Sequence, residues 1–274
     1  AGQVKKIVVL INSANTLQVD LQKNNEYDVD ACMWIGDVGI SGINAVAEIL
    51  AGNVTPSGSL VDTYLYDNFS APAMMNFVPT VYEGYEEGVI PEHAKTYMIY
   101  QEGIYVGYKY YETASDDGVI NYEDVVKYPF GYGLSYTTFE QKMNDFSDNG
   151  DNVTFNVTVT NTGDVAGKDV VEVYFTPPYT NGGIEKASVN LIDYAKTGEI
   201  APGESETVEF TINKEDMASY DANEIKVAGG GYILEAGEYT VSVRSDSHTV
   251  LDQATFTVDS DINYSESART TDNV

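Results

Sequence analysis

The chain has 274 residues, of which 14 are basic and 43 acidic, so its formal net charge is −29. Nucleic acid and anionic membranes bind cationic surfaces, and this balance argues against both as partners. Apolar residues make up 43% of the sequence, enough for well-formed cores, but no segment approaches the unbroken apolar length of a membrane span. A chain of this length more often forms two domains than one.

Residues 4–65 have the pattern of an α/β unit. A β-branched run over 5–12 predicts one buried strand, and a second apolar run over 29–35 predicts another. The segment over 16–25 fits a short helix or an irregular crossover. Continuous apolar runs of this kind are typical of parallel strands that are buried on both faces.

A glycine-rich turn and a helix follow the second strand. Apolar residues at helical spacing predict a helix that begins at Ile43 and stops at Gly52, and the segment over 59–65 predicts a third strand. Three strands and one or two helices are too few to cover both faces of a parallel sheet. We therefore expect residues 1–65 to be a partial α/β sandwich domain with mostly parallel strands.

Residues 66–139 predict a long connector of low regularity that is packed on neighbouring domains. Pro72, Pro79 and Pro91 interrupt any extended element. The segment over 100–139 intersperses tyrosines with glycines, a pattern that suits neither a regular helix nor a clean strand. Tyrosine packs at boundaries between core and solvent and glycine permits tight turns, so we expect this run to lie between two bodies.

From Asn152 onward the sequence alternates apolar and polar residues with a period of two. Strand-length segments separated by turns rich in glycine and proline predict a β-sandwich over residues 140–258. No cysteine pair is present, so a fibronectin type III-like arrangement is favoured over an immunoglobulin domain with its disulfide. The polar run over 259–274 predicts a linker tail. The strand-like segments are 152–161, 170–177, 205–213, 238–245 and 253–258.

Several motifs in order resemble one known family. They are KKIVVLINSANTLQVD from Lys5, the strand, loop, helix and turn from Trp34 to Tyr64, YQEGIYVGYKYYE from Tyr100 and YPFGYGLSYTTFE from Tyr128. With NTGDVAGKDVVEVYFTPP and IAPGESETVEFTI farther along, they are similar to the C-terminal portion of glycoside hydrolase family 3, the β-glucosidase-like enzymes. The resemblance covers nearly the whole chain and implies an α/β domain followed by a fibronectin-like domain.

The chain departs from the family pattern at several positions. Asp37 and Ile40 stand where many relatives have a Pro-Gly-Gln-Glu-type sequence, and Ser59 replaces the usual arginine after the PSG turn. Lys109 stands where arginine is common, and because lysine lacks the planar fork of arginine, a bidentate contact there is altered. The tail after Val258 resembles the connection in relatives whose halves are exchanged, so that the barrel domain follows.

Glycoside hydrolysis needs two carboxyl groups, a proton donor and a nucleophile or base, on either side of the scissile bond. The resemblance implies that the nucleophilic aspartate comes from a (β/α)₈ barrel and the acid/base glutamate from an earlier part of the α/β domain. Neither motif occurs in this sequence, so we expect no catalytic residue in it. The chain is predicted to be a structural segment of a retaining β-glucosidase-like hydrolase, inactive alone. Its implied partners are the missing barrel, the rest of the α/β domain and a carbohydrate substrate.

Asp37 and Trp34 are the candidate substrate-binding residues. Asp37 follows a predicted parallel strand, where open α/β sheets place their ligand crevices, and Trp34 beside it could stack on a sugar. The alternatives are an aspartate that caps the helix from Ile43 or satisfies backbone donors, and a tryptophan buried in a core or interface. Glu102 and Lys109 could pair along the connector.

The remaining motifs predict neither a metal site nor a cofactor. Cys32 is the single cysteine, and its apolar strand pattern predicts a buried, inert thiol. The acidic run over 145–151 lacks the acidic residue that a calcium loop needs at its twelfth position, where Asn156 stands. The glycines over 36–42 do not have the spacing of a nucleotide-binding loop.

Two further hypotheses stay open. The chain could be a standalone carbohydrate-binding or adhesion module, in which case its tyrosine rings should form an exposed coplanar row. The missing half could also be supplied as another chain or a cleaved partner. A fragment should instead show exposed apolar faces and an unpaired sheet edge where further α/β strands belong.

Overall fold

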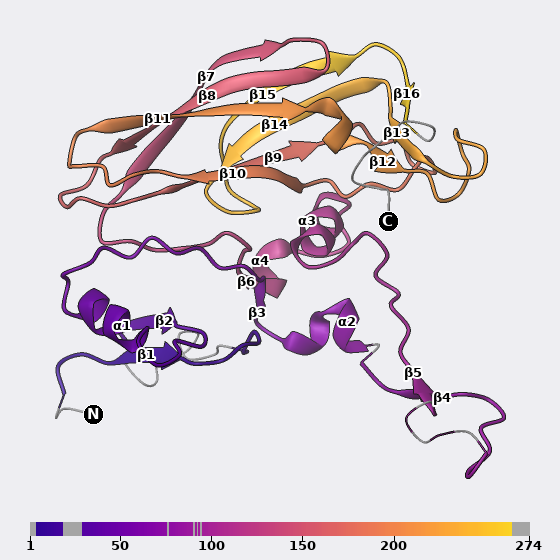
Figure 1. Ribbon diagram of the computed structural model, residues 1–274, viewed down its shortest axis with the longest axis horizontal. Coiled ribbons are helices and arrows are strands. Elements are labelled where there is room, and N and C mark those ends of the chain that lie inside the picture. Colours follow the sequence, from indigo (N-terminus) through magenta and orange to yellow (C-terminus); the bar gives the residue numbers. More distant parts are fainter. Residues whose placement is uncertain are drawn as a thin grey trace.

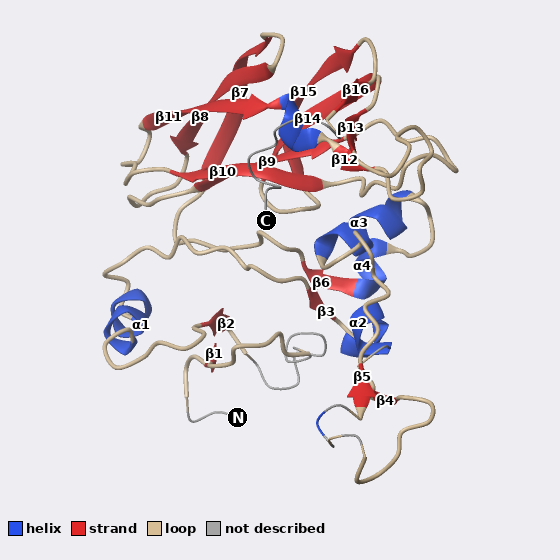
Figure 2. Cartoon of the chain, turned by 45° about the vertical axis from the view of Figure 1, so that its right-hand side comes forward, coloured by secondary structure: helices blue, strands red, loops and turns tan. Residues whose placement is uncertain are grey.

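The computed structural model describes residues 4–18, 29–75, 77–89, 91, 93 and 95–264. Three parts lie along the chain (Figure 1): a small α/β unit near the N-terminus, a connector that carries short helices, and a large β-sandwich. The connector and the α/β unit lie on the same side of the sandwich, and Figure 2 shows the same arrangement from a second direction.

The α/β unit contains two parallel strands and one helix. Strand β1 (Val8–Ile11) pairs in parallel with β2 (Ala31–Trp34), and helix α1 (Ile43–Leu50) follows. The helix ends where Gly52 adopts φ +75° and donates from its backbone to Ile49 O at 2.9 Å, a termination that favours glycine. The two predicted strands and the predicted helix are confirmed. The predicted crossover over 16–25 extends outside the described residues.

The prediction of a third strand over 59–65 beside these two is wrong. Only β3 (Tyr64–Leu65) is extended, and it pairs antiparallel with β6 (Val126–Tyr128) of the connector. Leu60 N also donates to Tyr132 O at 2.9 Å. The connector therefore supplies the backbone partners that a neighbouring parallel strand was expected to supply.

The connector contains more regular structure than its tyrosines and glycines predict. Helix α3 (Tyr108–Asp116) begins after Gly107, which has φ +59°, and buries Tyr111, Glu112 and Ala114. Packing of that face overrides the modest helix propensity of tyrosine. The other elements are η1 (Asn68–Ser70), α2 (Pro72–Met75), α4 (Tyr122–Val125) and the pair β4 (Thr80–Val81) and β5 (Thr96–Tyr97).

The sandwich consists of two antiparallel sheets, as its alternating sequence predicts. One has the strand order β10-β9-β14-β15 and the other β11-β8-β7. Their bounds are β7 (Phe139–Asp148), β8 (Asn152–Asn161), β9 (Val170–Thr176), β10 (Asn190–Lys196), β11 (Ser205–Asn213), β14 (Gly237–Arg244) and β15 (Val250–Val258). Strands β7 and β10 were not predicted, because their sequences are rich in polar residues and do not alternate cleanly.

A third, small sheet involves the segment that was predicted to be a linker tail. Its order is β12 (Ser219–Tyr220), β13 (Tyr232–Leu234) and β16 (Ile262–Asn263), and η3 (Lys214–Met217) precedes it. Residues 262–263 therefore belong to a sheet and not to a linker. Asp261 holds them there, since its carboxylate accepts from Ala236 N at 2.7 Å and from Lys226 Nζ at 2.8 Å. The rest of the predicted tail, over 265–274, lies outside the described residues.

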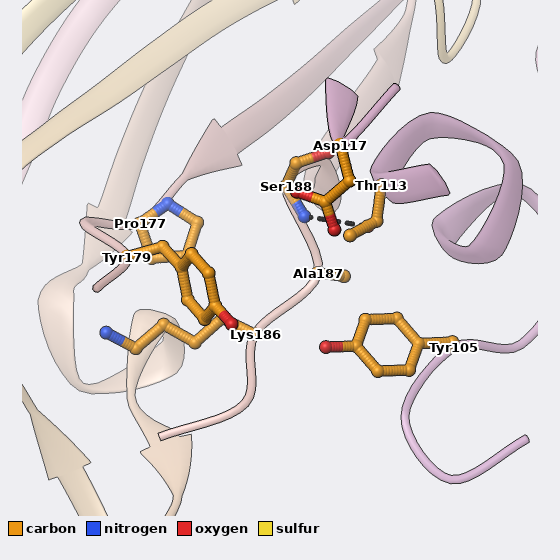
Figure 3. A pocket seen from close by; sticks show the side chains of 8 residues that line it. All are labelled: Tyr105, Thr113, Asp117, Pro177, Tyr179, Lys186, Ala187 and Ser188. Atoms are coloured by element: carbon orange, nitrogen blue, oxygen red, sulfur yellow. Dashed lines mark hydrogen bonds between the residues drawn. The ribbon is translucent and has the colours of Figure 1, made fainter. Parts of the chain in front are cut away.

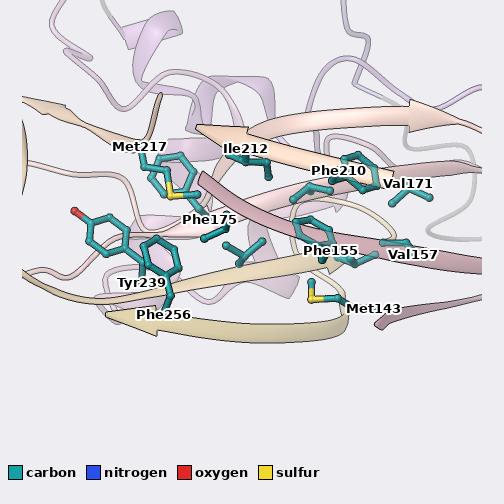
Figure 4. Packing of buried hydrophobic residues seen from close by; sticks show 14 of the residues in the cluster. Met143, Phe155, Val157, Val171, Phe175, Phe210, Ile212, Met217, Tyr239 and Phe256 are labelled. Carbon is teal, nitrogen blue, oxygen red and sulfur yellow. The ribbon is translucent and has the colours of Figure 1, made fainter. Parts of the chain in front are cut away.

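The main hydrophobic core fills the sandwich (Figure 4). Alternate residues of β8 point inward, so Val153, Val157 and Val159 are fully buried. Phe155 stacks on Phe210 of the neighbouring edge strand β11 in the same sheet, with ring centroids 5.2 Å apart. The apolar residues that alternate along β8 therefore share one face of the sheet and pack together in the core.

Asn161, at the end of β8, is fully buried and uses its whole hydrogen-bonding capacity. Its Oδ1 accepts from Thr137 Oγ1 at 2.7 Å and from Gly163 N at 3.0 Å. Its Nδ2 donates to Val165 O and to Ile200 O, both at 2.8 Å. One side chain therefore ties the end of the connector to two loops of the sandwich.

Replacing this side chain tests its contribution. Asn161→Ala removes four hydrogen bonds, among them those to the buried residues Thr137 and Ile200, and is expected to lower the free energy of unfolding by about 2 to 4 kcal/mol. The exposed Asn223 offers the control, because Asn223→Ala should change it by less than about 0.5 kcal/mol. Urea unfolding followed by circular dichroism gives both values, and equal midpoints for the two variants would contradict the assignment.

Candidate functional site

The structure places the predicted site residues at the carboxyl edge of the two-stranded parallel sheet. Trp34 is the last residue of β2, and its Nε1 donates to Ser13 O at 2.8 Å, so the indole links the ends of β1 and β2. Gly36 lies against the same ring, because a Cβ there would be 3.1 Å from Cζ2. Trp34 is thus held in place while part of its surface stays exposed.

Asp37 is exposed on the same edge and forms a local turn. Its Oδ1 accepts from Gly39 N at 3.1 Å, and α1 has no side-chain hydrogen bond at its N-cap, Gly42. Of the alternatives for Asp37, the structure therefore favours satisfaction of a backbone donor over capping of the helix. Its position leaves it accessible to a ligand.

A small cavity lies where the connector meets the sandwich (Figure 3). Its volume is about 60 Å³, well below the roughly 300 to 1,000 Å³ of a typical small-molecule site. Ser188 N donates to Thr113 Oγ1 at 3.0 Å across it, and the Ser188 hydroxyl is buried without a partner. A cavity of this size holds water rather than a sugar. It is lined by Tyr105, Thr113, Asp117, Pro177, Tyr179, Lys186, Ala187 and Ser188.

The segment over 129–136, PFGYGLSY, contacts both the α/β unit and the sandwich. The Phe130 ring stacks on Tyr108 of α3 with centroids 4.8 Å apart, and Phe130 O accepts from Ser247 N of the sandwich at 2.8 Å. Tyr128 and Tyr132 pack on each other at 5.1 Å. These aromatic rings pack mainly against protein.

The glycines of this segment are required by close approach. Gly131 has φ +87°, and a Cβ there would overlap the carboxylate of Glu172. A Cβ on Gly133 would lie 2.5 Å from Gly58 O in the PSG turn over 56–58. Only glycine allows the two backbones to meet this closely.

Hydrogen bonds from two sides fix the PSG turn. Ser135 Oγ donates to Pro56 O at 2.8 Å, and Lys196 Nζ of β10 donates to Ser57 O at 2.7 Å. Just before the turn, Thr55 Oγ1 donates to Ala166 O at 2.7 Å. The turn is therefore one point at which the α/β unit is attached to the rest of the molecule; Tyr136 OH, which donates to Ile49 O of α1 at 2.8 Å, is another.

A group of polar side chains that no sequence motif predicted lies between α3, α4 and the loop after β14; Glu112, Tyr122 and Ser247 are buried, and His248 is exposed. The Glu112 carboxylate accepts from Tyr122 OH and Ser247 Oγ, each at 2.8 Å, and lies 2.8 Å from His248 Nδ1. The His248 ring stacks on Tyr122 at 3.7 Å. The only feature of the sequence that pointed to this polar group was the rarity of histidine, since His248 is one of two in the chain.

The electrostatics of this group follow from its contacts. The hydrogen bond to Glu112 raises the pKa of His248 above its ordinary value, against the opposing effect of burial. Burial, together with the Glu112 carboxylate, raises the pKa of Tyr122, which therefore stays protonated and donates. Lys109 has its pKa lowered by burial, and no ion pair joins it to Glu102 among the described side chains.

The minor candidates have structural roles. Burial raises the pKa of the Cys32 thiol, which makes it a poor nucleophile at neutral pH. In the acidic run over 145–151, Asp148 Oδ1 accepts from Lys214 Nζ at 2.6 Å and from Gly150 N at 3.1 Å. In the part of the chain that the structure describes, no three potential ligands gather into a metal site, and no helix is long and apolar enough to cross a membrane.

The fold defines a class of protein: a partial α/β unit joined through a packed connector to a fibronectin type III-like sandwich. Residues 1–108 match the glycosyl hydrolase family 3 C-terminal domain, and residues 169–247 match the fibronectin type III-like domain. The chain belongs to glycosyl hydrolase family 3, as part of its C-terminal portion.

Relatives and solved structures agree with this assignment. A β-glucosidase of Ruminococcus albus is 35% identical over 93% of this chain, and an exo-α-(1→6)-L-arabinopyranosidase of Bifidobacterium longum is 31% identical over 95% of it. The structure of β-glucosidase 3B from Thermotoga neapolitana in complex with glucose matches 94% of this chain at 33% identity, with a TM-score of 0.77. The chain spans only 24%, 30% and 32% of these three proteins, respectively.

The contact between the two glycine-containing segments can be tested with a matched pair. Gly133→Ala forces a Cβ into Gly58 O and is expected to cost about 1 to 3 kcal/mol, whereas a Cβ on Gly58 meets open space and Gly58→Ala should cost less than about 0.5 kcal/mol. Trp34 is the single tryptophan and lies in the α/β unit, so its fluorescence during urea unfolding reports on this unit. Equal midpoints for the two variants would show that the close approach does not stabilise it.

Proposed function

We propose that this chain is a bracing segment of a β-glucosidase-like hydrolase that acts on β-linked glucosides or oligosaccharides. In this proposal it does not carry out the reaction itself. It holds part of the α/β domain against the fibronectin-like domain, and the remainder of the enzyme supplies the catalytic carboxyl groups. The names of the β-glucosidase relatives support the substrate class.

One observation carries the proposal: the α/β unit exposes side chains that a complete domain would bury. Val8 and Leu10 of β1 are 42% and 39% exposed, and Ile43 and Leu50 of α1 are 49% and 47% exposed. The described sheet has only two strands, so each has a free edge. Parallel sheets are normally covered on both faces, which supports further strands and helices packing here.

The proposed mechanism is that of a retaining glycosidase with a covalent glycosyl-enzyme intermediate. Its nucleophilic aspartate would come from a barrel domain and its acid/base glutamate from an earlier part of the α/β domain, so this chain contributes neither. Asp37 and Trp34 would lie at the carboxyl edge of the completed sheet, where they could contact substrate. The domain limits at residues 65 and 139 stay predictions.

The rival hypothesis is a carbohydrate-binding module. Tyr100 is 84% exposed and favours it, because an exposed ring can stack on a sugar. Against it, Tyr108 packs on Phe130, and Tyr111 and Tyr122 are buried. The run over 100–139 therefore lacks the row of exposed rings that such a module needs.

Calorimetry separates the two hypotheses. Glucose and cellobiose titrated into the purified chain are expected to give no saturable heat, and p-nitrophenyl β-glucoside is expected not to be hydrolysed. The same sugars titrated into bovine serum albumin give the background heat of dilution. Intact mass spectrometry of the sample tests for a co-purified barrel polypeptide. Saturable binding that Tyr100→Ala abolishes would overturn the bracing proposal in favour of a binding module.

If the proposal holds, adding the remaining part of the enzyme as a separate polypeptide should restore hydrolysis. Asp37→Ala should then raise KM for the glucoside several-fold with an unchanged unfolding midpoint for the purified chain. Trp34→Ala should also raise KM several-fold, but with a lower midpoint, because it loses the hydrogen bond to Ser13 O. Unaltered kinetics in both variants would remove these two residues from the substrate site without affecting the bracing role.

A further inference from the structure

A cluster of polar side chains, most of them ionisable, lies where the connector packs on the sandwich; most are buried, Tyr108 is half-buried, and His248 is at its exposed rim. We name it the junction cluster. It lies beneath the PFGYGLSY segment and takes residues from α3, α4, β9, β14 and the loop after β14. Its members are Tyr108, Glu112, Tyr122, Glu172, Tyr174, Arg244, Asp246, Ser247 and His248.

Two members can change charge near neutral pH. Glu172 of β9 is buried under Gly131, and its Oε2 accepts from Tyr174 OH at 2.6 Å. His248 pairs with Glu112 across the junction, 136 positions along the chain. Glu172 thus lies under the PFGYGLSY segment, and His248 connects the sandwich to α3. The charge of each residue therefore affects the stability of the contact between the connector and the sandwich.

The surroundings of these two groups carry more negative than positive charge. Asp246 acts on both, Asp169 also faces Glu172, and Glu123 of α4 also faces His248. Arg244 contributes a positive charge within the cluster. It donates to Ser242 Oγ at 2.9 Å and to Ser247 O at 2.7 Å, and the negative charge of Asp116 of α3 also acts on it. Loss of a proton gives Glu172 a negative charge and removes the positive charge of His248, so either event makes the cluster one unit more negative.

We propose that the junction cluster is a pH-sensitive contact, which holds the connector on the sandwich at mildly acidic pH and releases it as the pH rises above neutrality. At low pH Glu172 is neutral and His248 is paired as a cation with Glu112. At high pH Glu172 is a buried carboxylate beside Asp246, and Glu112 loses its cationic partner. The proposal does not depend on whether the chain binds sugar.

The sign of the effect is the same for both groups. Burial raises the pKa of Glu172 to about 7 from its ordinary 4.5, and the bond to Glu112 raises the pKa of His248 above 6.5. The closed junction therefore binds both protons more tightly than the open chain. The resulting stability is complete below the ordinary values and is lost as the pH rises through the values in the folded state.

Hydrogen exchange with mass spectrometry tests the proposal on the native chain. After correction for the intrinsic pH dependence of exchange, protection of amides over 108–125 is expected to fall about tenfold or more between pH 5.5 and 8.5. In Glu172→Gln, whose neutral amide can still accept from Tyr174, the fall should shrink to about threefold or less, and protection at pH 8.5 should exceed that of the native chain.

Two further variants keep the test decisive. Glu209→Gln removes an exposed carboxylate from β11 and controls for the general effect of the −29 charge, so it should behave like the native chain. His248→Phe keeps an aromatic ring against Tyr122 but removes the titratable imidazole, so it should also reduce the loss of amide protection between pH 5.5 and 8.5. A pH response that is identical in the native chain, Glu172→Gln and His248→Phe, or that Glu209→Gln reduces equally, would overturn the proposal.

Discussion

The molecule depends on one close backbone contact, in which Gly133 of the PFGYGLSY segment meets the carbonyl oxygen of Gly58 in the PSG turn. No side chain fits between them, since a Cβ on Gly133 would lie 2.5 Å from that oxygen. The contact brings Ser135 within reach of Pro56 O and places Leu60 and Tyr132 in backbone register. Without it, the α/β unit would lose its main attachment to the connector and the sandwich.

The same segment also organises the chemistry of the interior. Gly131 leaves space for the Glu172 carboxylate, and Phe130 accepts a backbone bond from Ser247, whose side chain donates to Glu112. A buried carboxylate is costly unless donors surround it, and Glu112 has three partners. The aromatic and glycine residues of this segment therefore attach the parts of the molecule to one another, and rings such as Phe130 pack against protein.

The exposed apolar side chains of the α/β unit contrast with the complete core of the sandwich. Val153, Val157 and Val173 of the sandwich are fully buried, whereas Val8 and Leu10 of β1 are not. The relatives are three to four times longer than this chain, which spans 24% of one and 32% of another. A sandwich with a complete core, joined to an α/β unit that exposes apolar side chains, agrees with the proposed bracing role inside a larger enzyme.

Several local elements and the family could be predicted from the sequence alone. Period-two alternation in 152–161 became β8, helical spacing and Gly52 bounded α1, and the ordered motifs identified the family. Other features depend on long-range packing: β3 pairs with β6, α3 is a helix, and Glu112 contacts His248, which lies 136 positions farther along the chain. The structure also places Asp37 and Trp34 on the same edge of the two-stranded sheet. The physical reason is that periodicity and turn chemistry report the neighbours of a residue along the chain, whereas pairing and charge contacts depend on which distant segments packing brings together.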